Sequence, residues 1–502
     1  MTFKTLVRPN FYRDSVALMR LAADIEALPG IEQASAIMAT EANLALLSET
    51  GAAPETITAG PNDLLVVVTG ADANSLAAAI DQAAARLDGE ATASPSGEGE
   101  APPRPRSLVA AAAETPAANL ALISCPGEYA AAEAMKALRL GRDVMIFSDN
   151  VSIEDEIALK TLAETEGRLV MGPDCGTAII NGVPLAFANI VRRGPVGIIA
   201  ASGTGLQQVA CLLDRSGVGI SQAIGTGVRD LADAVGGTTM LRAIELLSRD
   251  PETESLVLIS KPPGKAVAAR VIERAGRAGK PVVVAFIGAE PPAEMPANVT
   301  FAATLAEAAM LAAGTEAPPS ATDAATIADL AGGFAAGQRL LVGLYSGGTF
   351  RAETIVIAAP ALGDISSSDA PDIGGHVVLD LGDDVFTRGR PHPMIDFGIR
   401  NERIRAAAED PAMAVVLLDV VLGRGAHPDP AGALVPAIEE ASAVAKSNGR
   451  RLVFVGFVCG TEADPQRLSA QEAALARAGV IVEPSNAAAV GTAIRLLEET
   501  RR

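Results

Sequence analysis

The sequence predicts an α/β protein with at least two doubly wound units of parallel sheet and a small α+β unit at its amino end. From about residue 119 onward, short apolar runs alternate with longer segments of helical periodicity. This alternation is typical of parallel strands joined by right-handed helical crossovers. Two of the apolar runs end in a Ser-Gly-Thr or Ser-Gly-Gly-Thr turn that leads into a helical pattern. The 502 residues, 49% of them apolar, allow roughly three domains with buried cores.

The amino-terminal unit, residues 1–88, shows both kinds of periodicity. Its pattern predicts helices over residues 15–27 and 73–87 and strands over residues 33–38 and 63–68. Residues 89–117 are rich in Pro, Ser, Glu, Gly and Ala, and such a composition buries too little apolar surface to fold alone. We interpret this segment as a flexible linker.

The strand–helix rhythm then continues through three larger segments, with expected bounds 118–187, 188–315 and 336–502. A second linker is expected over residues 316–335, where two prolines interrupt the pattern. Strands are predicted over 120–124, 143–147, 168–171, 196–200, 220–224, 255–260, 281–287, 339–344, 376–381, 413–418 and 451–458. Helices are predicted over 128–140, 153–166 and 466–478, among others.

Composition argues against several classes of protein. The formal net charge of −20 disfavours binding to DNA or RNA, which requires clustered Lys and Arg. The first residues carry no continuous apolar region, and no apolar run approaches the ~20 residues that span a bilayer. The four cysteines lie far apart without a CxxC pair, so we expect neither a disulfide framework nor a metal site. The chain is therefore expected to be cytoplasmic, with no nucleic-acid or membrane partner.

Two glycine-rich turns are candidates for binding phosphate. Each lies where a predicted strand feeds a helix, and free backbone N–H groups at a helix start bind anions without a cationic side chain. Two such positive helix ends that face one another could hold a single phosphoryl group. The alternative is that both are ordinary βα turns of a parallel sheet. The candidate residues are Ser202, Gly203, Thr204 and Gly205 in the first turn, and Ser346, Gly347, Gly348 and Thr349 in the second.

Several short segments, in order along the chain, resemble succinyl-CoA ligase and the related NDP-forming acyl-CoA synthetases. They are ISCPGEYA at 123–130, RLVMGPDCG at 168–176, GPVGIIAASGTGLQQ at 194–208 and DPAMAVVLLDVVLGRG at 410–425. The resemblance implies a Rossmann-like CoA-binding-type domain followed by two flavodoxin-like CoA-ligase-type domains. It also implies that phosphate is a substrate and that coenzyme A is a candidate cofactor. The residues it places beside the coenzyme are Cys125, Pro126, Asp174 and Cys175.

The sequence departs from that family at its catalytic histidine. The loop that carries the family's phosphohistidine reads GAEPPAEM at 288–295 and contains no histidine. The carboxylate that orients the phosphohistidine corresponds to Gln208, an amide. No region resembles an ATP-grasp domain, and there is no P-loop motif. Partner subunits are therefore expected to complete the enzyme.

The order of segments over the whole chain resembles the FdrA family, including the amino-terminal unit and FTRGRPHPMIDFGIRNERI at 386–404. That family is acyl-CoA synthetase-like. One branch is implicated as a subunit of oxamate carbamoyltransferase, which moves a carbamoyl group between oxalurate and phosphate in purine catabolism. The resemblance implies a similar transfer here, together with partner subunits.

The loop that contains His392 supplies the candidate catalytic residues. Arg388 and Arg390 could form bidentate contacts with a carboxylate or phosphate. His392 could act as a general acid or accept a phosphoryl group, with Asp396 orienting its ring. The alternative is a structural ion pair between Asp396 and Arg400 beside an exposed His392.

Other reactive residues have plainer interpretations. Cys125 could be a nucleophile if a helix start lowered its pKa, or it could be a small buried residue. Lys261, at the end of a predicted strand, could contact an anion or lie in a solvated loop. His376 is interpreted as structural, and His427 fits either role.

The leading hypothesis is thus an enzyme subunit that transfers a carbamoyl or acyl group to or from phosphate. A second hypothesis is an acyl-CoA synthetase component in which His392 replaces the missing phosphohistidine and a partner binds the nucleotide. A third, of a different class, is a non-catalytic regulatory or scaffold subunit that retains ligand binding.

Overall fold

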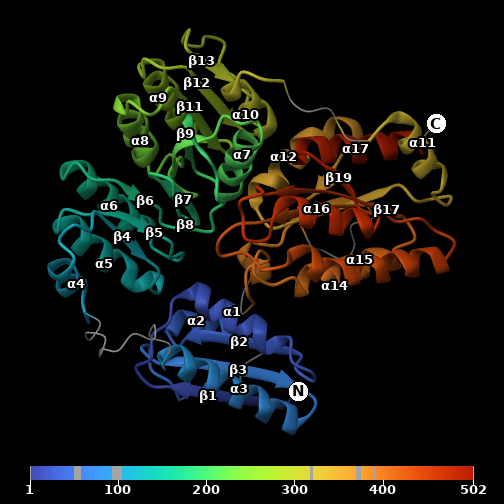
Figure 1. Cartoon of the computed structure of the whole chain (residues 1–502), viewed down its shortest axis with the longest axis horizontal. Helices are drawn as coiled ribbons and strands as arrows, with labels where there is room; N and C mark the ends of the chain where they lie inside the picture. The colour runs from blue at the N-terminus through green and yellow to red at the C-terminus, as the bar shows by residue number, and fades with distance from the viewer. Residues whose placement is uncertain are drawn as a thin grey trace.

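The computed structural model describes residues 2–49, 58–92, 105–316, 320, 322–368, 375–387 and 390–500. These residues form four sheets, each with its own helices, and Figure 1 shows the four units arranged around a common junction. The amino-terminal unit, in blue, lies beside the second and fourth units. The sheets and their helices confirm the predicted α/β class.

The amino-terminal unit is an antiparallel sheet of order β1-β3-β2 covered by helices. Its elements are β1 (Thr2–Arg8), α1 (Ser15–Glu26), β2 (Gln33–Met38), α2 (Glu41–Glu49), β3 (Leu64–Gly70) and α3 (Ala73–Thr92). The Asp14 side chain caps α1 by accepting the Ala17 N–H at 3.0 Å. The central strand β3 is buried along its whole length, whereas the edge strand β1 is largely exposed. Because β1 lacks an apolar run, its sequence does not predict a strand.

The second unit is a three-stranded parallel sheet of order β4-β5-β6. Its elements are α4 (Leu108–Glu114), β4 (Leu120–Ile123), α5 (Gly127–Arg139), β5 (Asp143–Ile146), α6 (Ile153–Thr165) and β6 (Val170–Met171). Helix α4 lies inside the segment that the sequence predicts as a flexible linker, and that prediction is wrong for these residues. The helix forms because it is alanine-rich and because Ser107 caps it through the Ala110 N–H.

The third unit is a seven-stranded sheet of order β13-β12-β11-β9-β10-β7-β8. Strands β13 to β10 are parallel, and β7 and β8 add an antiparallel edge. The chain enters this sheet at β7, before the division that the sequence predicts at residue 187. Its strands are β7 (Thr177–Ile180), β8 (Val183–Ala186), β9 (Arg193–Ala200), β10 (Ile220–Gly225), β11 (Ser255–Ser260), β12 (Val282–Phe286) and β13 (Val299–Phe301). Its helices are α7 (Gly203–Arg215), α8 (Thr238–Arg249), α9 (Lys265–Gly276) and α10 (Leu305–Ala313).

The fourth unit is a six-stranded parallel sheet of order β15-β16-β14-β17-β18-β19. Its strands are β14 (Leu340–Tyr345), β15 (Ile365–Ser366), β16 (His376–Asp380), β17 (Met413–Val421), β18 (Val453–Cys459) and β19 (Ile481–Glu483). Its helices are α11 (Ala324–Gly332), α12 (Gly348–Leu362), α13 (Asp384–Thr387), α14 (Gly398–Glu409), α15 (Pro430–Ser447), α16 (Leu468–Arg477) and α17 (Asn486–Glu499). Helix α11 lies within the second predicted linker, where it packs on α17 through buried Ile327 and Ala331.

The third and fourth units share one hydrophobic core. Helix α7 packs against α12, and residues of both helices belong to a single buried apolar cluster. Phe350 of α12 lies edge-on to Phe457 of β18, with ring centroids 5.0 Å apart. Because α7 follows the strand β9 and α12 follows the strand β14, this core brings the carboxyl ends of two parallel sheets together. Ligands of open α/β sheets bind at such strand ends.

Glu353 is a fully buried acid at this interface. Its two carboxylate oxygens accept the Leu305 N–H at 2.7 Å and the Asn486 side-chain N–H at 2.8 Å. Burial raises the pKa of Glu353 to about 7, and the two hydrogen bonds offset this only in part.

Within the described part of the chain, no helix is both long and apolar enough to span a membrane.

We predict that Glu353 makes the protein less stable as the pH rises. A raised pKa means that the folded state holds the proton more tightly, so this contribution is complete below about pH 4.5 and is lost as the pH passes about 7. In Glu353→Gln the decline in the free energy of unfolding between these values should become shallower. Urea denaturation at several pH values measures it, with the exposed Glu439→Gln as control; an unchanged slope would contradict the prediction.

Candidate functional site

The first turns of α7 and α12 touch at the centre of the site. The Ser202 and Thr349 hydroxyl oxygens lie 2.6 Å apart, and both side chains are buried. Gly347 lies so close to Thr204 that a Cβ at Gly347 would collide with the threonine side chain. The structure thus brings together the two glycine-rich turns that the sequence singles out, and confirms that the two helix starts meet. Phosphate binding between them stays a prediction.

Local sequence explains the shape of each turn. Ser202 has an extended backbone and caps α7 by accepting the Gly205 N–H at 2.9 Å. Gly205 leaves no room for a side chain, because its Cβ would lie 2.8 Å from the Ser202 hydroxyl. At α12 the N-cap residue is Gly347, and no side chain caps the helix. Backbone N–H groups of its first turn are therefore available to an anion.

A buried ion pair holds the second turn in place. Asp419 of β17 accepts hydrogen bonds from the backbone N–H of Ser346, at 3.0 Å, and from its hydroxyl. Arg400 of α14 lies 2.9 Å from the Asp419 carboxylate and donates to the Asp419 carbonyl at 2.6 Å. The alternative ion pair between Asp396 and Arg400 is therefore wrong. Arg400 instead compensates a carboxylate that is buried completely.

Asp380 and Lys261 lie beside the start of α12. A Cβ at Gly348 would lie 2.8 Å from Asp380 Oδ2 and 3.5 Å from Lys261 Nζ. Burial raises the pKa of Asp380 to about 6, although Arg351 and Lys261 oppose the shift. Lys261 follows β11, so two different units supply this pair. The geometry favours the anion-contacting interpretation of Lys261 over that of a solvated loop.

Three further carboxylates, which interact electrostatically with one another, lie in the same region as Lys261. Asp149 follows β5, Asp174 follows β6, and Asp384 begins α13. Desolvation and repulsion from the other two raise the pKa of Asp174 to about 6, and Arg229 and Lys261 lower it. Burial and repulsion from Asp384 raise the pKa of Asp149. Among the described residues, no three His, Cys, Asp or Glu side chains are placed to hold a metal ion.

His392 lies next to Asp380, but Asp396 does not orient it. The His392 Nδ1 atom accepts the Met394 N–H at 3.2 Å, so the neutral ring carries its proton on Nε2. A Cβ at Gly382 would lie 2.8 Å from this Nε2 and 3.2 Å from Asp380 Oδ1. Burial, with Arg400 as a second cause, lowers the pKa of His392 to about 4. His392 is therefore neutral at pH 7 and presents an N–H donor.

The other predicted members of this loop are dispersed. The Asp396 carboxylate accepts the Gly398 N–H at 2.8 Å, which corrects its predicted role beside His392. Arg390 lies 3.4 Å from Glu402 and lines a separate cavity. Arg388 lies outside the described residues. Of the other histidines, His376 is buried and its Nδ1 accepts the Leu341 N–H, as befits its structural interpretation.

The two cysteines near the predicted coenzyme turn differ. Cys175 is buried, its thiol donates to the Thr177 and Gly225 carbonyls, and burial raises its pKa to about 12. The thiol is thus directed into the core, and a place for Cys175 beside a cofactor stays a prediction. Cys125 and Pro126 line a cavity instead. Burial also raises the pKa of Cys125, which argues against an activated nucleophile.

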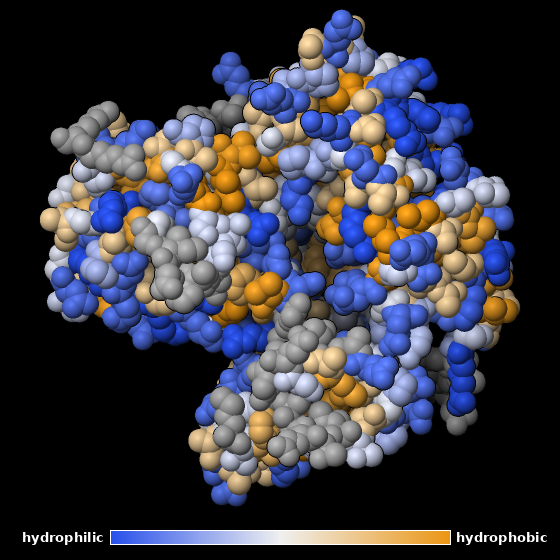
Figure 2. Space-filling model, turned by 180° about the vertical axis from the view of Figure 1, so that it is seen from behind, coloured by the Kyte–Doolittle hydropathy of each residue, from blue (hydrophilic) through white to orange (hydrophobic). Residues whose placement is uncertain are grey.

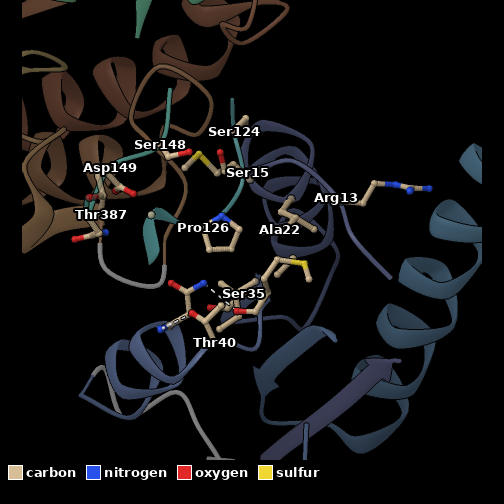
Figure 3. Close-up of a pocket in the computed structure, with 18 of the residues that line it drawn as sticks. Arg13, Ser15, Ala22, Ser35, Thr40, Ser124, Pro126, Ser148, Asp149 and Thr387 are labelled. Carbon is tan, nitrogen blue, oxygen red and sulfur yellow. Dashed lines mark hydrogen bonds between the residues drawn. The ribbon is translucent and has the colours of Figure 1, made fainter. Parts of the chain in front are cut away.

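This cavity, of about 330 Å³, lies where the amino-terminal unit meets the second and fourth units. Figure 3 shows Pro126 facing Ser35 and Thr40 of the amino-terminal unit, with Asp149 and Thr387 at one end. Figure 2 shows a hollow where the units meet. The Tyr12 hydroxyl donates to the Ser124 carbonyl at 3.0 Å, which joins the amino-terminal unit to the second. The apolar wall of the cavity is formed by Leu18, Met19, Ala22, Leu47 and Met38.

Two family models match separate parts of the chain. A family model described as CoA-ligase matches residues 344–496, and one described as AllF, heavy metal-associated domain matches residues 1–104. The chain is 29% identical over 183 residues to the succinate–CoA ligase [ADP-forming] subunit alpha of Aquifex aeolicus, covering 35% of this chain and 58% of that subunit. A solved structure, the dinucleotide-forming acetyl-coenzyme A synthetase 1 of Ca. Korarchaeum cryptofilum with phosphate and ADP, aligns over 76% of this chain and 83% of its own, with 17% identity and a TM-score of 0.29.

The match to the CoA-ligase model falls on the fourth, six-stranded unit of this α/β protein. Over 97% of both chains the protein is 42% identical to the uncharacterized protein YahF of Escherichia coli K12. The chain belongs to the family of YahF, and about a third of it is similar to succinate–CoA ligase alpha subunits.

Sequence reasoning missed the polar residues that hold the site together. Asp419 is a lone acid inside the otherwise apolar strand MAVVLLDVV, and this isolated charge is a signal that a partner is buried nearby. Its partner, Arg400, lies on a helix with no marked apolar face, and Asp380 is the last residue of its strand. Nothing in the sequence pairs these residues.

We predict that Asp380 makes anion binding depend on pH. Sulfate keeps its charge between pH 5 and 8, so its affinity should fall as Asp380 ionises through about pH 6 and begins to repel it. In Asp380→Asn this fall should become smaller. Isothermal titration with sulfate at several pH values measures the effect, with the exposed Asp364→Asn as control. An identical pH dependence in Asp380→Asn and in the wild type would contradict it.

Proposed function

We propose that this protein is the group-transfer subunit of an acyl-CoA synthetase-like enzyme, and that it moves a carbamoyl or acyl group to or from phosphate. The observation that carries the proposal is the contact between Ser202 and Thr349, which joins two helix starts at one point. Two positive helix ends, an uncapped first turn and Lys261 converge there. Such an arrangement favours an anion whose charge changes during the reaction.

In the carbamoyl case the reaction balances without a covalent enzyme intermediate. An oxygen of hydrogen phosphate attacks the carbamoyl carbon of oxalurate and the bond from that carbon to the oxamate nitrogen breaks. The leaving nitrogen takes the proton that the phosphate gives up. The products are carbamoyl phosphate and oxamate. Lys261 and the helix N–H groups would hold the phosphate, and the Nε2–H of His392 would donate a hydrogen bond to the developing charge.

The cavity beside Pro126 would hold the group donor. Asp149 and Asp384 line this cavity and also repel the Asp174 carboxylate, on which Lys261 acts as well. Arg390 supplies the cavity with a guanidinium group for a substrate carboxylate. If coenzyme A is the acceptor instead, the apolar wall of this cavity and the Cys125–Pro126 turn would hold its chain, and the coenzyme would supply a thiol.

Two alternative functions are also considered. An acyl-CoA synthetase component that uses His392 as phosphoryl acceptor is supported by the family relationship, but the Nε2 atom that faces Asp380 is the protonated one. A non-catalytic subunit would retain ligand binding only. In each case partner subunits are expected, because the sequence contains no nucleotide-binding domain.

The deciding experiment is phosphorolysis of oxalurate, followed as carbamoyl phosphate formed. The purified chain is assayed alone and together with the products of its neighbouring genes. Product that requires the neighbours supports a transferase subunit. Formation of acyl-CoA that depends on CoA and ATP, without carbamoyl phosphate, would replace this proposal by the ligase alternative.

Lys261→Ala should lower kcat/KM for the transfer by about 100-fold or more, because a single electrostatic donor at a reacting anion is worth this much. Lys265→Ala, an exposed lysine at the end of the same loop, should retain activity within about twofold and serves as the matched control. Equal activity of the two variants would argue for the non-catalytic alternative.

His392→Gln separates the two enzyme hypotheses. If His392 only donates a hydrogen bond, the variant should lose roughly 10- to 100-fold in kcat, and the wild-type protein should take up no ³²P that resists denaturation. Acid-labile ³²P labelling of the wild type that is absent from His392→Gln would establish the phosphohistidine alternative instead.

A further inference from the structure

A second cavity, of about 320 Å³, lies at the seam between the three-stranded and the seven-stranded sheets. One wall comes from the end of α6 and from β6, and the other comes from α8 and α9. None of its lining residues belongs to the glycine-rich turns, to the His392 loop or to the larger cavity. Its charged lining residues are Lys160, Glu164, Arg168, Arg242, Glu245, Arg270 and Arg274.

The lining is positively charged in a protein whose formal net charge is −20. Lys160 does not add to this charge, because its ammonium lies 2.8 Å from both Glu156 and Asp230. Four arginines then face two glutamates, which leaves an excess of two positive charges.

The glutamates do not neutralise the arginines individually. Glu245 is shared by three guanidinium groups, with distances of 3.2 Å to Arg242, 2.8 Å to Arg249 and 4.0 Å to Arg274. Within the described part of the chain, neither Arg168 nor Arg270 lies within ion-pair distance of a carboxylate. Unneutralised guanidinium groups around one cavity repel one another until an anion binds.

One of the guanidinium groups also has an unused donor. One terminal nitrogen of Arg242 donates to the Gly167 carbonyl at 3.1 Å, and the other donates to the Glu245 carboxylate. Its Nε atom is buried and has no hydrogen-bond partner in the structure. A buried donor without a partner is costly, and an acceptor in the cavity reaches this nitrogen only if the Arg242 side chain shifts.

We propose that this cavity binds a small oxyanion that carries at least two negative charges. Arg168 contacts it from the second unit, and Arg242 and Arg270 contact it from the third. The ligand is either a phosphate ester or polyphosphate, or a dicarboxylate, because guanidinium groups match both kinds of oxyanion. Hydrogen bonds already cross this seam, such as that from the Thr239 hydroxyl to the Val170 carbonyl at 2.8 Å. A bound dianion adds a link between the two sheets.

The test is isothermal titration of the full chain at low salt with pyrophosphate and, separately, with succinate. The double variant Arg168→Ala/Arg270→Ala should weaken binding by at least about tenfold, since it removes both unneutralised charges. Arg249→Ala is the matched control: it lies on α8 and shares Glu245, but it does not line the cavity. The control should bind within about twofold of the wild type. Whichever titrant binds identifies the source of the oxyanion.

Titration in the Lys261→Ala background separates this site from the paired helix starts. Binding that survives Lys261→Ala and is lost in the double variant supports the proposal, whether or not the proposed transfer reaction is found. Unchanged affinity in the double variant, an equal loss in Arg249→Ala, or no binding of either titrant below about 1 mM would overturn it. Should the double variant fail to fold, Arg270→Gln on the exposed surface of α9 provides the same comparison.

Discussion

The contact between the first turns of α7 and α12 is the constraint on which the rest of the structure depends. Each helix carries a partial positive charge at its start, so bringing two starts together is unfavourable unless something compensates it. Burial of the apolar faces of both helices in one core offsets this cost, and the hydroxyl pair of Ser202 and Thr349 occupies the point of contact. An anion bound there would relieve the remaining repulsion. The same arrangement that stabilises the packing of two sheets therefore favours an anion site.

Some charged residues around this contact form an ion pair, and others do not. Asp419 and Arg400 neutralise one another inside the fourth unit and hold the Ser346 turn, so they are positioning residues. Among the described residues, Asp380, Asp174 and Lys261 make no ion pair of this kind, and burial raises the pKa of both acids to about 6. Perturbed acids beside a lysine are typical of a site that exchanges protons or binds ions.

The relation to the acyl-CoA synthetase-like proteins extends to the scaffold but not to every catalytic part. The loop after β12 has no histidine, and the neutral His392 reaches the helix starts from the fourth unit instead. The amino-terminal unit matches a model named for heavy metals, and residues 1–104 contain no cysteine and no histidine. Its α1, β2 and α2 instead form a wall of the larger cavity.

The sequence by itself determined the α/β class, most strands and the two phosphate-binding candidates, because apolar periodicity and glycine-rich turns are local signals. It did not reveal β1, an edge strand with an exposed pattern, or α4 and α11, which lie in segments that resemble linkers. Only the tertiary structure decided that Ser202 meets Thr349, that Arg400 pairs with Asp419 rather than Asp396, and that Cys175 is buried. The reason is physical: these contacts join residues far apart in the chain, and they depend on how two sheets pack their helices together.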